Sequence, residues 1–351
     1  MHHGRPRQAT ASAAVLRRWI EQFEDRRVAV IGDLILDHFL WGDATRISPE
    51  APVPVILLEA ESYRLGGAAN VAANLRALGA QVSVFGVIGR DEAGRRLRAL
   101  LAEAGIDDRG VLELAGRPTT IKQRVLAQNK HVLRIDREHS GPIGAAAGRL
   151  ARRLAQASFD VVVASDYGKG CLTAPLMRRL LETARRRGWP VCVDPKGNEL
   201  HCRGATLLKP NLRELAHLAG HAIASEKDLA AAAERVRRRY RCRHLLVTCG
   251  PAGMRLFDDD GAAAIRSATL EVADVTGAGD TVAASVALAL AAGAPARHAA
   301  LIANLAAGVV VTKPGTAVAS RDEILAHLQA DRAAAAKPQA KRETRAGRPR
   351  R

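Results

Sequence analysis

The sequence predicts an α/β protein whose central sheet is mainly parallel and is covered by helices on both faces. Two observations lead to this expectation. Apolar runs rich in β-branched residues, such as "QVSVFGVIG" (81–89) and "FDVVVAS" (159–165), have the length and composition of buried strands. Helical patterns rich in alanine and arginine, such as 91–105 and 173–187, lie between such runs. Strands that alternate with helices pair in parallel, because each helix returns the chain to the same edge of the sheet.

The first quarter of the chain begins this alternation. We expect a buried first strand over 27–36 ("RVAVIGDLIL") and an edge strand over 52–60, where the prolines exclude a central position. Two glycines open a helix over 66–80, and the helix that follows strand 81–89 ends at Gly105.

The alternation is interrupted by two segments rich in strand patterns. The residues "PTTIKQRVLAQNKHVLRIDRE" (118–138) predict a hairpin of two short strands around 128–130. Together with the region 43–64, the segment 118–137 is a candidate for a small β-lid that closes over a site at the edge of the sheet. The alternative is that both segments are ordinary edge strands.

The second half returns to regular alternation, and no internal repeat is visible. Helices are expected over 144–157, 173–187, from Asn211, over 226–240, and twice within 277–311. Strands are expected over 159–165, 190–194, 205–210 and 243–250, with further short strands within 253–266.

Length and composition describe an ordinary folded chain. We divide the 351 residues into an N-terminal extension (1–26), one α/β domain (27–330) and a basic, disordered tail (331–351). Neither a signal peptide nor a bilayer-spanning apolar run is recognisable, so we expect a cytoplasmic protein without membrane contact. The five cysteines are scattered without a CxxC pair, which is typical of reduced, packed thiols.

The net charge of +17 raises the alternative of a nucleic-acid-binding protein. Residues 332–351 alone carry eight lysines and arginines against one glutamate, so much of the excess lies in the tail. No aromatic residues are interleaved with these charges, so this segment lacks the side chains on which nucleic-acid bases stack. A nucleic-acid partner is the less favoured interpretation.

The stretch "DVTGAGDTVAAS" (274–285) carries the clearest chemical signal. Its glycines let backbone N–H groups approach a ligand, and the following alanine-rich helix presents its N-terminus to an anion. A phosphoryl group in transfer needs such donors, and Asp280 stands where it can take a proton from an attacking hydroxyl. The alternative is a plain helix start with an acid that stabilises the helix dipole. The Lys-Ser/Thr ending of a Walker A loop and a G-x-G-x-x-G fingerprint are both missing.

Two long motifs resemble the signatures of the ribokinase-like (PfkB) carbohydrate kinases. They are "GGAANVAANLRALGAQVSVFGVIG" (66–89) and "DVTGAGDTVAAS", where Ser285 replaces the usual small Ala or Gly. "RISPEAPVPV", "SDYGKG", "DPKG" and "ATLLKPNLRE" extend the resemblance to the members of this family that act on D-glycero-β-D-manno-heptose 7-phosphate, from about Arg27 to about Ala326. Many of those kinases are fused to a nucleotidyltransferase with an HxGH signature. "HLAGH" (217–221) has the wrong spacing for it, so we expect the single-function form.

The resemblance implies a ribokinase-like fold and a role for specific residues. Asp280 would be the catalytic base, and Gly277, Ala278 and Gly279 the anion hole. The sugar phosphate would be bound by Asp33, Asp37, Gly66, Gly67, Asn70, Lys122, Arg124, Arg134, Asp166 and Lys169. The nucleotide side would comprise Lys196, Asn211, Glu214, Thr248, Gly250, Gly253 and Asn304.

Several of these residues also have a purely structural interpretation. Asp33 suits a turn at a strand end, and Asn70 suits a helix cap or first turn. Asn211 and Glu214 have the spacing of a capping box. Each basic residue alone could be a solvated surface charge. Asp166 would either contact the sugar or hold Lys169.

The implied activity is phosphorylation of the anomeric hydroxyl of the heptose 7-phosphate to the 1,7-bisphosphate, in the biosynthesis of the lipopolysaccharide core. ATP is the expected phosphoryl donor, and Mg²⁺ would arrive with ATP near Asn211 and Glu214 without direct protein ligands. The alternatives are a kinase of another sugar or sugar phosphate, and a sugar sensor without catalysis. Lid strands of this family often pair between subunits, so we expect a homodimer.

Overall fold

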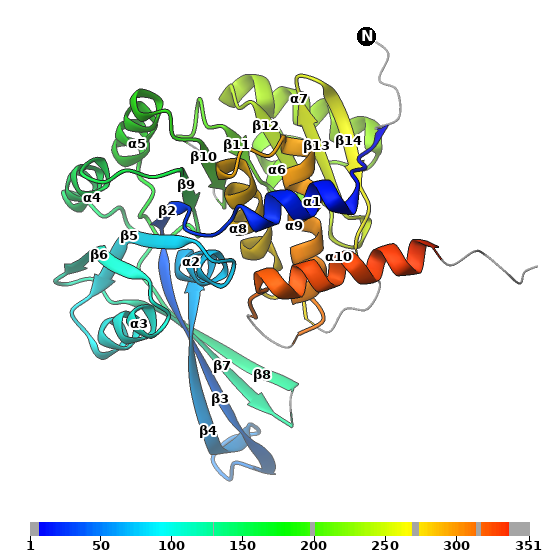
Figure 1. The fold of residues 1–351 in the computed structure, drawn as a ribbon. Coiled ribbons are helices and arrows are strands. Elements are labelled where there is room, and N and C mark those ends of the chain that lie inside the picture. Colours follow the sequence, from blue (N-terminus) through cyan, green and yellow to red (C-terminus); the bar gives the residue numbers. More distant parts are fainter. Residues whose placement is uncertain (1–6, 129, 197–200, 269–273, 314–316, 337–351) are drawn as a thin grey trace, which may run out of the picture.

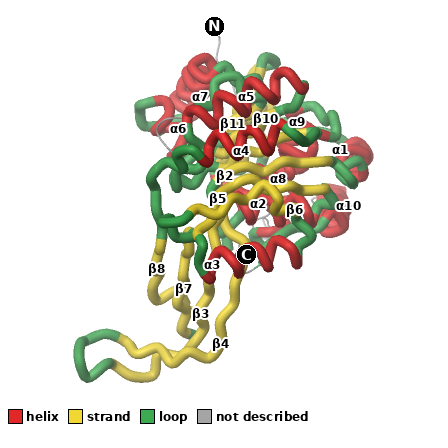
Figure 2. Tube along the Cα trace, turned by 90° about the vertical axis from the view of Figure 1, so that its left-hand side faces the viewer, coloured by secondary structure: helices red, strands yellow, loops and turns green. Residues whose placement is uncertain are grey.

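The chain forms a large sheet between two layers of helices, with a second, smaller sheet that projects from one edge (Figures 1 and 2). The computed structural model describes residues 7–128, 130–196, 201–268, 274–313 and 317–336. The large sheet has, in spatial order, β1 (Arg7–Gln8), β14 (Gly261–Ile265), β13 (Met254–Asp258), β12 (His244–Thr248), β11 (Leu207–Leu208), β10 (Val191–Asp194), β9 (Val161–Ser165), β2 (Arg27–Gly32), β5 (Gln81–Gly89) and β6 (Asp107–Leu114). Among these strands only β13 is antiparallel to its neighbours, which confirms the mainly parallel sheet.

Helices cover both faces of this sheet, as the alternation predicted. Those on one face are α1 (Ala13–Glu21), α2 (Ala68–Ala77), α3 (Glu92–Glu103), α8 (Ala278–Ala291), α9 (Ala296–Val310) and α10 (Arg321–Ala336). Those on the other are α4 (Ala146–Ala155), α5 (Ala174–Arg187), α6 (Leu212–Ala219) and α7 (Glu226–Tyr240). Along β9, Val161 and Val163 pack into the first core, and Val162 and Ala164 into the second. Both faces of a strand are therefore apolar, which is why these strands read as unbroken apolar runs.

The two segments rich in strand patterns form a separate, smaller sheet and are not edge strands of the large one. Its strands lie in the order β4 (Pro54–Gly67), β3 (Leu34–Ile47), β7 (Thr120–Ala127) and β8 (Lys130–Arg137). β7 and β8 are the predicted antiparallel hairpin, and the Pro-flanked β4 is an edge strand as expected. Figure 2 shows this sheet extending well beyond the body of the molecule. We call it the lid.

The prediction of one strand over 27–36 is wrong. The chain leaves the large sheet after Gly32, and β3 of the lid begins at Leu34. Leu34 and Leu36 are as buried as the residues of β2, so hydrophobicity continues across the break and conceals it. A side chain on Gly32 would meet the Ser165 carbonyl oxygen at 1.9 Å, so the crossing point is packed too tightly for any other residue.

The two ends of the chain contain elements that the sequence interpretation omitted. β1 pairs with β14, and α1 buries Leu16 and Ile20 in the first core next to α10 (Figure 1). The strand β6 and the helix α10 were also not predicted. The backbone of α10 continues to Ala336, and the rest of the predicted tail, 337–351, lies outside the described residues.

Two predictions from composition concern the whole chain. All five cysteines are buried and unpaired, as expected for reduced, packed thiols. None of the described helices is both long enough and apolar enough to cross a membrane.

Candidate active site

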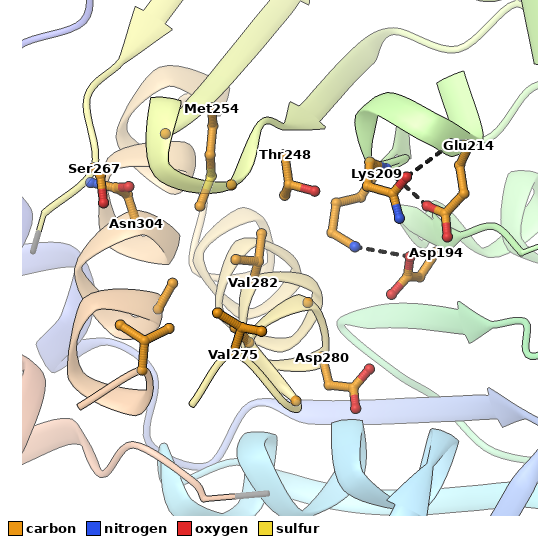
Figure 3. Close-up of a pocket in the computed structure, with 18 of the residues that line it drawn as sticks. Asp194, Lys209, Glu214, Thr248, Met254, Ser267, Val275, Asp280, Val282 and Asn304 are labelled. Carbon is orange, nitrogen blue, oxygen red and sulfur yellow. Dashed lines mark hydrogen bonds and ion pairs between the residues drawn. The ribbon is translucent and has the colours of Figure 1, made fainter. Parts of the chain in front are cut away.

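A pocket of about 760 Å³ opens where the central strands end and α8 begins (Figure 3). Figure 3 shows Asn304 and Ser267 at one end, with Lys209 and Asp194 at the other, where Asp280 also lies. The pocket wall includes all residues predicted for catalysis and for the nucleotide: Lys196, Asn211, Glu214, Thr248, Gly250, Gly253, Gly277, Ala278, Gly279, Asp280 and Asn304. Of the predicted sugar ligands, Asp166 alone contributes to this wall. Segments more than 80 residues apart in the sequence therefore converge on one cavity.

The start of α8 has the bare backbone that its sequence predicted. Gly277 is the N-cap residue with a φ of 82°, which favours glycine because a Cβ would be strained there. No described residue accepts a hydrogen bond from the amide of Gly277 or Gly279. The amide of Ala278, in contrast, donates to the Val275 carbonyl at 3.2 Å. Of the three amides predicted to form an anion hole, that of Ala278 is thus bonded within the protein, and those of Gly277 and Gly279 are open among the described residues.

Asp280 is buried in the first turn of α8, with a bond to each carboxylate oxygen. Asn70 of α2 donates to Oδ2 at 2.6 Å, and the hydroxyl of Tyr167 donates to Oδ1. Burial raises the pKa of Asp280, although the bonds from Tyr167 and Asn70 and the charge of Lys209 act in the opposite direction. A carboxylate of raised proton affinity suits a general base.

Lys209 and Asp194 form a largely buried ion pair at the base of the pocket, 2.9 Å from Nζ to Oδ1. Burial raises the pKa of Asp194 to about 7, because desolvation outweighs the attraction of Lys209. Burial by itself would lower the pKa of Lys209, but Asp194 raises it on balance. A Cβ added to Gly279 would lie 3.6 Å from Lys209 Nζ, so this cation stands directly beside the open amides.

Sequence reasoning missed this pair and Tyr167, although all three residues lie in or beside motifs that were quoted. Asp194 ends β10, and Lys209 follows β11 directly. A charged residue at the carboxyl end of a buried parallel strand lies at the edge where ligands bind in such sheets. That position was the available signal.

Asn211 and Glu214 form the capping box that their spacing predicted, and their role toward the nucleotide stays a prediction. The Asn211 side chain accepts from the Glu214 amide at 2.9 Å, and Glu214 Oε2 accepts from the Asn211 amide at 2.8 Å. This is the capping box of α6. Because α6 begins at the pocket, both side chains also form part of its wall.

The far end of the pocket is formed by less polar groups. After β12, Gly250 begins the 3₁₀ turn η1 (Gly250–Ala252) and Gly253 follows it, and both glycines have a positive φ. Asn304 of α9 donates to the Arg266 carbonyl at 2.8 Å. Lys196 lies nearer to Asp280, with its Nζ 5.6 Å from the centre of the Tyr167 ring.

Asp37 and Arg124 lie on the lid side of Asp280. Arg124 Nη1 is 2.6 Å from Asp37 Oδ1, and both side chains are largely buried. A Cβ on Gly66 would meet Asp37 Oδ2 at 2.7 Å, so only glycine leaves this carboxylate open. Gly67 has a φ of 58° and caps α2, which carries Asn70. Asp37 directly follows the segment 27–36 that was expected to be one core strand, and it lies on β3 of the lid.

Asp33 supports a loop with its carboxylate. Its two oxygens accept from the amides of Tyr167 at 2.8 Å, Lys169 at 3.0 Å and Cys171 at 3.0 Å. The side chain is buried, and three protein donors occupy it. This arrangement favours the structural interpretation of Asp33 over contact with a sugar.

The other basic candidates each face an acid. Lys122 Nζ lies 3.5 Å from Asp136 Oδ2, and Arg134 Nε lies 2.9 Å from Asp136 Oδ1. Lys169 Nζ lies 2.6 Å from Glu138 Oε2.

Asp166 does not hold Lys169, contrary to one of the two expectations for it. Its carboxylate accepts from the Gly168 amide at 2.8 Å within the same loop. Burial raises its pKa.

Open amides at a helix start, with a buried lysine and a buried carboxylate beside them, are the kinds of group that phosphoryl transfer requires. The chain belongs to the pfkB family of carbohydrate kinases, whose family model matches residues 25–323. It is accordingly an ATP-dependent sugar kinase.

Relatives and solved structures agree with this assignment. The bifunctional protein HldE of Citrifermentans bemidjiense is 46% identical over 323 residues, which cover 89% of this chain and 66% of that protein. HldE of Geobacter metallireducens is 46% identical over 311 residues, covering 87% and 63%. The chain thus spans about two thirds of the length of these relatives.

The fold is shared with solved kinases at low sequence identity. Phosphofructokinase-2 from Escherichia coli, in complex with potassium, superposes with a TM-score of 0.74 at 19% identity, covering 88% of this chain and 99% of that one. Ribokinase from Arabidopsis thaliana, complexed with ribose and ATP, gives 0.69 at 20% identity, covering 87% and 99%. These matches confirm the ribokinase-like fold.

Proposed function

We propose that this kinase phosphorylates the anomeric hydroxyl of D-glycero-β-D-manno-heptose 7-phosphate and forms the 1,7-bisphosphate for lipopolysaccharide core biosynthesis. The similarity to the HldE proteins supports this choice of sugar. The proposal assigns ATP to the pocket of Figure 3 and the sugar phosphate to the space between Asp280 and the lid.

The observation that carries the proposal is the distribution of charge on the lid. Arg64 and Lys122 are the register partners of Asp37 on the neighbouring strands, so all three share one face of the sheet. Arg124 and Arg134 lie on that same face, because they pair with each other two residues along from Lys122 and Asp136. Four cations therefore share this face with Asp37 and Asp136, an excess that suits a sugar with a phosphate of its own. The sequence interpretation did not include Arg64.

In the proposed reaction Asp280 accepts the proton of the attacking hydroxyl. The open amides of Gly277 and Gly279, with Lys209 beside them, stabilise the charge that develops on the transferring phosphoryl group. Mg²⁺ carried by ATP would neutralise phosphate charge, and oxygen atoms of Asn211 and Glu214 lie on the pocket wall.

The proposal includes a homodimer formed through the lid. Nine large hydrophobic residues are exposed among the described ones, and seven of them belong to the lid or its connecting loop: Ile47, Val53, Leu57, Leu58, Val132, Leu133 and Ile135. Apolar patches of this kind on an otherwise polar surface mark protein contacts. A second copy of the same lid offers a matching surface.

A coupled assay of ADP release tests the substrate. Heptose 7-phosphate is compared with fructose 6-phosphate, ribose and unphosphorylated heptose at equal concentrations. We expect kcat/KM to be largest for heptose 7-phosphate and to fall at least tenfold without the phosphate, since a charge-assisted contact is lost. If kcat/KM is larger for another sugar phosphate, the assignment as a kinase stands and the proposed substrate is wrong. Equal values with and without the phosphate would refute the role of the lid cations.

A further inference from the structure

Tyr167 contacts the carboxylate of Asp280 directly, and the proposed reaction does not yet explain this contact. It lies in the loop 166–171, between β9 and α5, and its hydroxyl donates to Asp280 Oδ1. The other oxygen, Oδ2, accepts from Asn70 at 2.6 Å. The two donors bind different oxygens of the base, so both of them restrict the orientation of the carboxylate.

The loop that carries Tyr167 is itself held rigidly. The Asp33 carboxylate accepts from the amides of Tyr167, Lys169 and Cys171, which is every second amide along the loop. On the other side Arg117 donates to the Lys169 carbonyl, and at 2.8 Å to each of two further carbonyls in the chain that leaves the lid, His139 and Gly141.

This loop is also closely packed at Gly170. A Cβ on Gly170 would meet the Gly141 carbonyl oxygen at 2.2 Å, and Gly168 and Gly170 both have positive φ. The position of the tyrosine hydroxyl is therefore set by the fold and does not depend on a flexible side chain alone.

We propose that Tyr167 is a positioning residue for the base: its hydroxyl aims the Asp280 carboxylate at the acceptor hydroxyl and stabilises the charged form that accepts the proton. This inference rests on the proposed role of Asp280. Each carboxylate oxygen can accept two hydrogen bonds, so the bond from Tyr167 leaves a site free for the substrate.

The groups that face Asp280 act in two opposed ways. Asp37 of β3 and Asp194 of β10 are acids near it, and their charges, like burial, favour the protonated form. Tyr167, Asn70 of α2 and Lys209 favour the carboxylate. Burial, followed by the charge of Asp280, raises the pKa of Tyr167 well above its usual value, so the hydroxyl keeps its proton and remains a donor.

The variant Tyr167→Phe removes only the hydroxyl and tests this role through the pH profile. We expect the acid limb of kcat/KM for the sugar to move upward by about one pH unit, with about a tenfold loss on that limb, because a hydrogen bond to a charged group is lost. The KM for ATP should be unchanged. Tyr63→Phe is the matched control, since it removes a lid hydroxyl that donates to Glu61 at 3.1 Å. An acid limb that stays in place in Tyr167→Phe would overturn the proposal, and a residue with a merely structural role would leave it there.

A second measurement needs no turnover and separates this inference from the proposed function. The thermal midpoints of wild type, Tyr167→Phe, Asp280→Ala and the double variant form a cycle at pH 8. If the two groups interact, Tyr167→Phe lowers the midpoint in the wild type and has a smaller effect once Asp280 is absent. Equal effects in both backgrounds would refute the contact. If the thermal midpoints show that Tyr167 and Asp280 interact, but heptose 7-phosphate is not the preferred sugar in the ADP-release assay, only the proposed substrate is refuted.

Discussion

The pocket beside α8 and the lid differ in the burial of their charged side chains and in the partners that these side chains have. At the pocket, Lys209 and Asp280 are buried and Asp194 is largely buried, and their partners come from other strands, helices and loops. On the lid, Arg134 lies on a strand whose residues are all exposed, and it pairs with a near neighbour of that strand, Asp136. The lid also exposes most of the large hydrophobic residues that are not buried.

From this difference we infer that the pocket carries out the chemistry and that the lid selects the substrate. Buried charges are held by a fold that would lose stability without their partners, so they keep one geometry. Exposed charges of the lid, such as Arg134, can change without loss of the core, whereas Asp37 and Arg124 of the lid form a largely buried pair. We therefore expect changes in the pocket to alter turnover and stability, and changes in the lid to alter affinity and association.

The largest effect is expected for Asp280→Asn. The amide retains the shape and cannot accept the proton, so kcat should fall by about 10²- to 10⁴-fold, the usual contribution of a general base. ATP binding, measured by calorimetry, should stay within about twofold. Asp322→Asn, on the exposed first turn of α10, is the control. Near-normal turnover in Asp280→Asn would show that the phosphoryl transfer does not take place at this pocket.

The second effect concerns stability. Lys209→Met leaves Asp194 buried without its partner, and the free energy of unfolding should fall by about 3–5 kcal/mol at pH 8. Lys227→Met, on the surface of α7, should change it by less than about 0.5 kcal/mol.

The same variant has a predicted pH dependence. The pKa of Asp194 is raised to about 7 in the folded protein and is about 4 when unfolded. Between pH 4 and pH 7, Asp194 binds more protons in the folded state than in the unfolded state. Its contribution to the free energy of unfolding therefore falls as the pH rises. The loss in Lys209→Met should therefore be smaller at pH 5 than at pH 8 in urea unfolding. An equal loss at both values would contradict the buried ion pair.

A smaller effect is expected from Arg124→Gln on the lid. The KM for the sugar phosphate should rise by about 10- to 100-fold, since a charge-assisted contact contributes about 1.5–3 kcal/mol. The KM for ATP should remain constant, and Arg235→Gln, an exposed position on α7, should change neither. If the KM for ATP rose equally, the division between lid and pocket would be wrong.

The smallest effect is expected from Leu133→Asp at the exposed surface of β8. Removing one apolar contact and adding a charge should weaken the proposed dimer by about tenfold in Kd, measured by sedimentation. Val15→Asp on α1 is exposed to a similar degree outside the lid and should leave association unchanged. A variant that stays as dimeric as the wild type would place the interface elsewhere.

Much of the fold was predictable because periodicity reports burial. Strand 81–89 and helix 226–240 were predicted at the bounds that β5 and α7 have, since each is a strong pattern with clear ends. The break at Asp33 was not predictable, because Leu34 and Leu36 are as apolar as the strand before them. The start of α8 was recognised from its glycines, whereas the hydrogen bond made by the Ala278 amide depends on a turn that no residue type specifies.

The sequence by itself determined the α/β class, the glycine-rich start of α8 and the acid beside it, because hydrophobic periodicity and backbone freedom are properties of neighbouring residues. Only the tertiary structure decided which groups meet that acid. Asn70 and Tyr167 reach Asp280 across 210 and 113 residues of chain, and Lys209 joins Asp194 between two strands. Such encounters follow from the order of strands in the sheet, and the pKa of a carboxylate depends on the burial and the charges that this order creates.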